Sequence, residues 1–160
     1  MNIPGDEAWA GSEDSIDARK ARSFWFGRSI DDLQKDFTAG RGIYRGHELL
    51  HMPRPAFQFY VFAFAQYLMS DAAIGDPDGA SCFLHYLAAR EKRDPGSVAQ
   101  IFERLEPTID FVAASQARFD ASRDSYGDFA EKAAQLKKLC GATHSRRDPE
   151  DQMLDPTDDA

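Results

Sequence analysis

A short segment of this 160-residue chain, from Gly46 to Pro53, reads GHELLHMP and contains the pattern H-E-x-x-H. On a helix this spacing places His47 and His51 on one face, one turn apart, with Glu48 beside them. Two neutral imidazoles so placed can bind Zn²⁺, and a nearby carboxylate can polarise a zinc-bound water and accept its proton. The segment therefore offers the chemistry of a small zinc-dependent hydrolase, with Glu48 as catalytic residue and the two histidines as metal ligands.

The five residues from His47 to His51 resemble the metal-binding helix of zincin metalloproteases. The resemblance implies a zinc ion, a third protein ligand and a helix that continues beyond the second histidine. Pro53 disfavours helical geometry at Met52, and no glutamate follows on the next predicted helix to act as the third ligand, because the next Glu is Glu91. We therefore prefer a short helix, from about Ile43 to Met52, that is ended by proline and binds no metal.

Two groups of aspartates could bind a cation, but each has a simpler structural explanation. The segment Asp76 to Gly79, DPDG, is like a fragment of a calcium-binding loop without its later ligands and its closing Glu. We interpret it as a turn and a helix N-cap. Asp120, Asp124 and Asp128 recur at a spacing of four around SRDSYG. A polar turn between helices accounts for them as well.

An arginine pair flanks Tyr44 in the segment GRGIYRG. Arg41 and Arg45 could contact an anionic partner there, although an ordinary surface loop is the preferred interpretation. The segment lacks the Lys-Ser or Lys-Thr ending of a phosphate-binding loop. The two cysteines, Cys82 and Cys140, form no spacing motif, so we expect buried, reduced thiols in a cytoplasmic protein.

Charge is distributed unevenly along the chain, whose formal net charge is −8. Residues 1–17 contain five acids and no Lys or Arg, residues 143–160 contain six acids and two arginines, and the body between them has 16 acids and 17 bases. No basic stripe supports nucleic-acid binding, and no apolar run suggests a membrane span or a secretory signal. The acidic ends predict disorder over 1–18 and 143–160, on either side of one helical domain over 19–142.

The body is predicted to be all-α, a single domain of about five to seven helices separated by proline and glycine. The most apolar predicted helix covers 56–69, AFQFYVFAFAQYLM, where aromatic residues occupy nearly the whole circumference. A helix that is apolar all round is usually buried at the centre of a protein. The other helices are expected to pack around this one.

Capping patterns predict where the other helices begin and end. Ser29, Asp76 and Asp94 are expected N-caps, and a proline suited to the first helical turn follows each of the last two. A separate helix is expected to start at Pro107, and the last helix is expected to end at Gly141.

The phrase PRPAFQFYVFAFAQYL, followed by further helices and by DSYGDF, resembles small bacterial all-helical proteins of uncharacterised or immunity type. The resemblance covers roughly residues 25–140 and is carried mostly by core aromatics. For immunity proteins it implies direct binding that blocks a cognate toxin. The sequence thus favours a non-enzymatic cytoplasmic binding protein with a protein partner and without nucleic acid, membrane or cofactor. A small zinc hydrolase that uses His47, Glu48 and His51 is the alternative.

Overall fold

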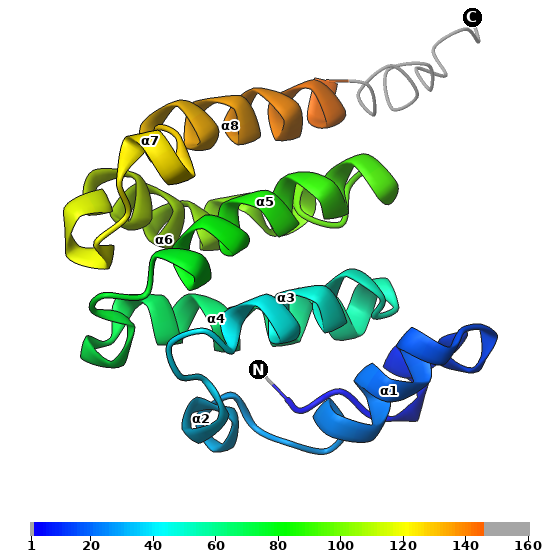
Figure 1. Cartoon of the computed structure of the whole chain (residues 1–160). Coiled ribbons are helices and arrows are strands. Elements are labelled where there is room, and N and C mark those ends of the chain that lie inside the picture. Colours follow the sequence, from blue (N-terminus) through cyan, green and yellow to red (C-terminus); the bar gives the residue numbers. More distant parts are fainter. Residues whose placement is uncertain (1, 146–160) are drawn as a thin grey trace, which may run out of the picture.

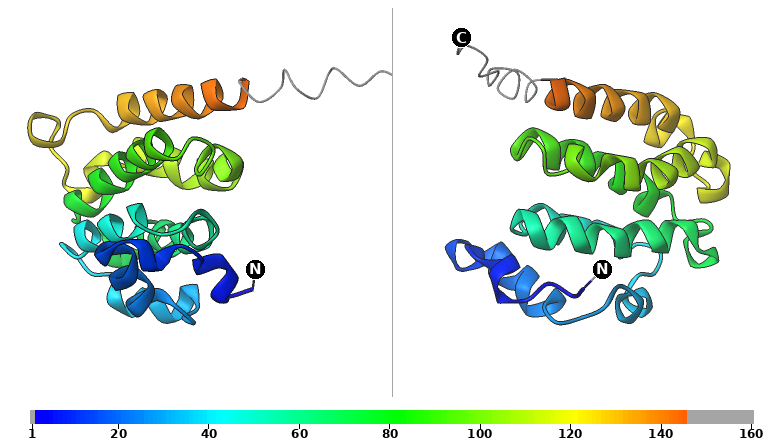
Figure 2. Two further views of the ribbon diagram at one scale, coloured as in Figure 1. Left: turned by 90° about the vertical axis from the view of Figure 1, so that its right-hand side faces the viewer. Right: turned by 180° about the vertical axis from the view of Figure 1, so that it is seen from behind.

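The helices of the chain stack in roughly the order of the sequence. Figure 1 shows the computed structural model, which describes residues 2–145. The α-helices of these residues are α1 (Ile16–Trp25), α2 (Ile30–Leu33), α3 (Gly42–Leu50), α4 (Arg54–Met69), α5 (Pro77–Arg93), α6 (Phe102–Ala114), α7 (Arg123–Tyr126) and α8 (Phe129–Ser145). The first two lie at one end of the stack and α8 at the other, and the side and rear views of Figure 2 show the same order.

The predicted all-α fold is confirmed, since the described residues contain helices and turns but no strand. Two of the eight α-helices, α2 and α7, are only four residues long. Six short 3₁₀ helices complete the secondary structure, at Asp6–Trp9, Ser12–Asp14, Gln34–Asp36, Asp71–Ala73, Ala99–Ile101 and Gln116–Phe119. No helix in this part of the chain is long and apolar enough to cross a membrane.

Helix α4 is the central element, as its aromatic pattern predicts. It packs against helices on both sides in the stack, including α2, α3, α5 and α6, and ten of its 16 residues are buried. The ring of Tyr60 lies against that of Trp25, with centroids 5.4 Å apart, and the ring centroids of Phe64 and Phe37 are 5.5 Å apart. Burial of rings on nearly every side of one helix explains why α4 has only a narrow polar side, at Gln58 and Gln66.

The N-terminal segment differs from the expected disorder over 1–18. Two 3₁₀ turns precede α1, and the side chain of Trp9 is fully buried. Its ring lies 5.8 Å from that of Tyr60. Asp6 and Glu13 form ion pairs with Arg22. Among its acidic residues the N-terminal segment has one large apolar side chain, that of Trp9. Burial of this ring stabilises an ordered segment, which the acidic composition alone does not predict.

Helix α6 corrects the expected start at Pro107, because that proline lies inside it. A proline within a helix removes one backbone hydrogen bond and costs about 3 kcal/mol. Leu105, Ile109 and Val112 share one side of α6 and are all fully buried. Their burial, at about 1.5–3 kcal/mol for each side chain, offsets that cost.

Most, but not all, of the predicted caps are present. Ser29 and Asp76 cap α2 and α5 through their side chains. Asp94 was predicted as an N-cap and is instead the residue after α5, where it accepts hydrogen bonds from Arg54 and Arg90. Helix α8 continues past the expected end at Gly141 to Ser145. The predicted disordered tail over 143–160 is wrong for residues 143–145, which belong to α8, and its remainder lies outside the described residues.

Candidate functional site

Helix α3, which carries the H-E-x-x-H segment, is held tightly against α5 by two glycines. A Cβ atom added to Gly46 would lie 2.2 Å from the ring of Tyr86, and one added to Gly42 would lie 2.9 Å from the Cα of Gly79. The Tyr86 hydroxyl also donates a hydrogen bond to the Ile43 carbonyl, at 3.2 Å. Because glycines four residues apart lie on one side of a helix, the backbone of α3 on this side is in direct contact with α5.

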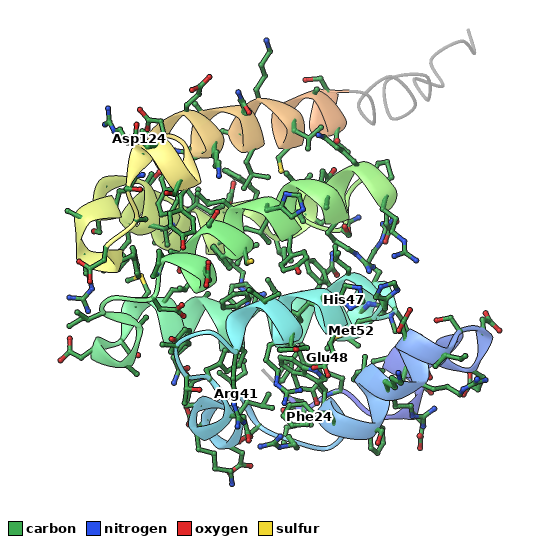
Figure 3. All side chains as sticks on the ribbon, viewed as in Figure 1. Phe24, Arg41, His47, Glu48, Met52 and Asp124 are labelled. Atoms are coloured by element: carbon green, nitrogen blue, oxygen red, sulfur yellow. The ribbon has the colours of Figure 1, made fainter. Side chains whose placement is uncertain are left out.

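A second side of α3 faces α1, and it fixes the position of Glu48. The Glu48 Oε2 atom accepts hydrogen bonds from the indole N–H of Trp25 at 2.8 Å and from Arg45 at 2.7 Å. The Arg45 guanidinium in turn lies over the ring of Phe24, 3.4 Å from its centroid. Figure 3 shows Glu48 directed toward Phe24, whereas His47 lies higher on the helix and away from that ring. The Glu48 carboxylate is therefore hydrogen-bonded to other residues of the same chain on this side of α3.

The C-terminal end of α3 is capped by a buried arginine from α5. Arg90, only 4% exposed, donates hydrogen bonds from Nη1 to the carbonyls of Leu50 and Met52, both at 2.8 Å. These carbonyls have no partner within α3 because the helix has ended. His51 is the first residue after the end of α3. The predicted short helix ended before Pro53 is confirmed, with its last residue at Leu50 instead of Met52.

The third side of α3 is exposed to solvent. Tyr44 is 73% exposed, the largest fraction among the exposed large hydrophobic side chains, and Ile43 is 41% exposed. The rings of His47 and His51 follow along this side, with centroids 4.7 Å apart. Tyr44 and the two histidines line a hollow of about 270 Å³ that is completed by Glu48 and, from α1, by Asp17 and Lys20.

Electrostatics in this hollow favour neutral histidine at position 51. Burial lowers the pKa of His51 below its ordinary value of 6.5, and the positive charges of His47, Arg93 and Arg90 lower it further. Asp17 acts in the opposite direction, with its Oδ2 4.0 Å from the His51 Nε2. A neutral imidazole can accept a hydrogen bond or bind a metal ion.

The structure brings the three residues of the zinc hypothesis onto one short helix but gives Glu48 another role. A zinc-bound water needs a carboxylate free to accept its proton, and the Glu48 carboxylate already accepts two hydrogen bonds on Oε2. Among residues 2–145, with the side chain of His144 not described, no three His, Cys, Asp or Glu side chains are grouped to hold an ion.

The remaining predicted sites have separate structural roles. Asp76 caps α5 and accepts hydrogen bonds from the Gly40 amide and the Tyr67 hydroxyl, so it joins three segments. Asp128 accepts hydrogen bonds from the first amides of α8. Asp120 is the non-glycine residue with a left-handed backbone conformation. These aspartates act as turn and cap residues, in agreement with the preferred interpretation of the sequence.

The arginine pair and the cysteines also separate into distinct environments. Arg41 is exposed, whereas Arg45 is paired with Glu48. The segment is helical from Gly42, so the expected surface loop is wrong. Cys140 is buried, and burial raises its pKa to about 12, while Cys82 is half-buried with a raised pKa. Neither thiol is activated as a nucleophile.

Three features of this region were missed from the sequence: the Gly42 and Gly46 pair, the Arg90 cap and the contribution of Asp17. The glycine spacing G-x-x-x-G was a usable signal, because it permits close approach of two helices. Arg90 gave no comparable signal, since its two carbonyl partners lie about forty residues earlier in the chain.

Comparison of the chain with protein-family models, with curated proteins and with solved structures finds no match. The structure itself shows an all-helical domain in which Tyr44 and His47 of α3 are exposed to solvent.

Proposed function

We propose that this chain is a non-enzymatic cytoplasmic binding protein that recognises a protein partner through the exposed side of α3, and that it acts as an immunity protein that blocks a bacterial toxin. The observation that carries the proposal is Tyr44, a large aromatic side chain left 73% exposed on a helix that is fixed on its other two sides. Tyrosine and arginine are enriched among the residues that dominate binding energy in protein interfaces.

The surroundings of Tyr44 support a protein ligand. Ile43 and His47 on the same short helix, and Arg41 immediately before it, are exposed beside Tyr44, so aromatic, aliphatic and polar groups lie together. Packing of Gly46 against Tyr86 of α5 and the hydrogen bond from Trp25 of α1 to Glu48 hold the helix in place before a partner arrives. A surface that is fixed in advance loses little conformational entropy on binding.

The proposal predicts a toxin gene adjacent to the gene for this chain, and the test is co-expression of the two proteins. The proposal predicts that the two proteins co-purify and that cells survive the toxin. Tyr44→Ala should weaken binding by at least about 2 kcal/mol, the size of an interface hot spot. Ile74→Ala is the matched control, because Ile74 is 54% exposed on a different part of the surface.

Two results would overturn the proposal. If the toxin neither co-purifies nor is neutralised, the immunity role is wrong. If it binds but Tyr44→Ala and Ile74→Ala behave alike, the exposed side of α3 is not the contact surface, and the interface must be sought elsewhere.

The competing hypothesis, a small zinc-dependent hydrolase, is supported by the two adjacent histidine rings. It predicts one zinc ion per chain after purification without chelator, and loss of that zinc in the double variant His47→Ala/His51→Ala. Our proposal predicts substoichiometric zinc that does not change in the double variant. Elemental analysis of both proteins separates the two hypotheses without knowledge of a substrate.

A further inference from the structure

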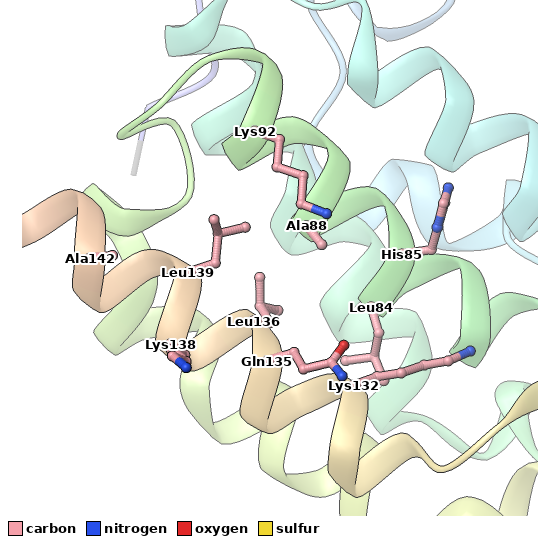
Figure 4. A pocket seen from close by; sticks show the side chains of 10 residues that line it. All are labelled: Leu84, His85, Ala88, Lys92, Lys132, Gln135, Leu136, Lys138, Leu139 and Ala142. Carbon is pink, nitrogen blue, oxygen red and sulfur yellow. The ribbon is translucent and has the colours of Figure 1, made fainter.

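A groove between α5 and α8, on a different part of the molecule, has features of a ligand site that the proposed function does not use. Its volume is about 550 Å³, within the range of about 300–1,000 Å³ that is typical of small-molecule sites. Figure 4 shows the groove with Leu136 and Leu139 of α8 on one wall and Leu84 and Ala88 of α5 on the other. The lining is therefore largely aliphatic.

The helical spacing explains how the two walls arise. On α5, Leu84, Ala88 and Lys92 are four residues apart and lie on one side of the helix. On α8, Leu136 and Leu139 are three residues apart and share a side in the same way. Leu84 and Leu136 are almost fully buried beneath the groove, whereas Ala88 contributes only a methyl group above them and leaves space open.

The charges around the groove are all of one sign, in contrast to the chain as a whole. Three lysines, Lys92, Lys132 and Lys138, are among the ten residues that line it, and none of the ten is acidic. The chain has a net charge of −8. Lys132 donates hydrogen bonds to the Tyr126 carbonyl and to Ser81. Lys92 and Lys138 are exposed and form no ion pair within residues 2–145.

We propose that this groove binds an amphipathic anion, an aliphatic chain that ends in a carboxylate. The chain lies on the leucine side chains and Ala88, and the carboxylate pairs with Lys92, whose side chain extends from α5 over the groove in Figure 4. An aliphatic wall alone would accept any apolar ligand, whereas an exposed ammonium group at its edge selects an anionic one. Gln135, which also lines the groove, donates a hydrogen bond to Glu131.

The test uses decanoate as probe, titrated into the full-length protein below its micelle concentration and followed by calorimetry. Decyltrimethylammonium, with the same chain and the opposite charge, is the matched ligand. We expect saturable binding of decanoate to one site and about five-fold weaker binding of the cation, since an exposed ion pair contributes up to about 1 kcal/mol. Raising the salt concentration should reduce the difference.

Two variants locate the site. Ala88→Trp should fill the groove and abolish binding of decanoate, and Lys92→Glu should weaken it by about five-fold or more. Lys20→Glu, which makes the same charge change beside α3, is the control and should bind as the wild type does. Ala142→Trp, at an exposed position on the groove wall, is a second filling variant if Ala88→Trp does not fold.

Three outcomes would overturn the inference. They are a failure of decanoate to bind in a saturable manner, equal binding of the two charged ligands, and filling variants that fold and bind decanoate as well as the wild type does. Because Tyr44 and the groove lie on different elements, loss of decanoate binding leaves the toxin experiment unaffected.

Discussion

At the scale of single residues, Glu48 decides how the H-E-x-x-H segment is interpreted. The spacing of the motif is fully compatible with a zinc site, and the helix forms as that site would need. The side chain of Trp25, 23 residues earlier, then donates its indole N–H to the carboxylate, and Arg45 donates a second hydrogen bond. The motif specifies which side chains lie together on the helix, but contacts with other elements determine whether their reactive atoms are available for chemistry.

His51 gives a prediction for pH dependence. Burial, with the charges of His47, Arg93 and Arg90, holds its pKa below 6.5 in the folded state. The unfolded chain then binds a proton at this residue at a higher pH than the folded chain does. We expect the free energy of unfolding contributed by this residue to be fully present above about pH 6.5 and to fall as the pH decreases through the folded pKa.

NMR titration of the histidine ring protons checks this expectation directly. His47→Gln should raise the pKa of His51, because it removes a neighbouring positive charge. His51→Gln should flatten the decrease in stability over that pH range, and His85→Gln, on α5 beside the other groove, serves as the control. A His51 titration at or above 6.5 would contradict the prediction.

At the scale of secondary-structure elements, the contact between α3 and α5 leaves no space for a side chain at Gly46. It depends on Gly46, because any side chain there would overlap the ring of Tyr86. We expect Gly46→Ala to reduce the free energy of unfolding by about 1–3 kcal/mol, the range for overpacking a core. The same variant should weaken partner binding, since it displaces the helix that presents Tyr44.

Gly141→Ala is the matched control for that experiment. Gly141 lies within α8, is exposed, and has open space where a Cβ would be placed. Replacing a helical glycine with alanine should stabilise the protein by about 0.5–1 kcal/mol. Chemical denaturation of both variants tests the contrast. Equal effects would show that helix propensity, and not contact with Tyr86, determines the result at Gly46.

Patterns within single elements were predictable, and contacts between elements were not. The aromatic circumference of α4, the caps at Ser29 and Asp76 and the proline-limited end of α3 follow from neighbouring residues. The predicted helix start at Pro107 was wrong because burial of Leu105 and Ile109 outweighs the free-energy cost of a proline within the helix. The hydrogen bond from Trp25 to Glu48 and the Arg90 cap join residues far apart in the sequence, so no local pattern records them. The residues of the candidate site could therefore be named from the sequence, whereas the contacts that hold them could not.

At the scale of the whole molecule, Trp9 attaches the acidic N-terminal segment to the core. Its ring is fully buried and lies near those of Tyr60 and Phe26. We expect Trp9→Ala to reduce the free energy of unfolding by about 3–5 kcal/mol, as for other large aromatic truncations. Smaller losses, close to those of the exposed control Ile3→Ala, would show that the segment is not packed as described.

The stacking order of the helices has a consequence for how the protein is made. Three aromatic partners of α4, namely Trp9, Trp25 and Phe37, precede it in the chain, and Phe83 of α5 follows it. Their loops to α4 are short compared with the chain, and short loops lose little entropy on closing. We therefore expect a nascent chain released only as far as Met69 to collapse around these rings on the ribosome. Helices α5 to α8 would then add to a nucleus that already exists, in the order in which they are synthesised.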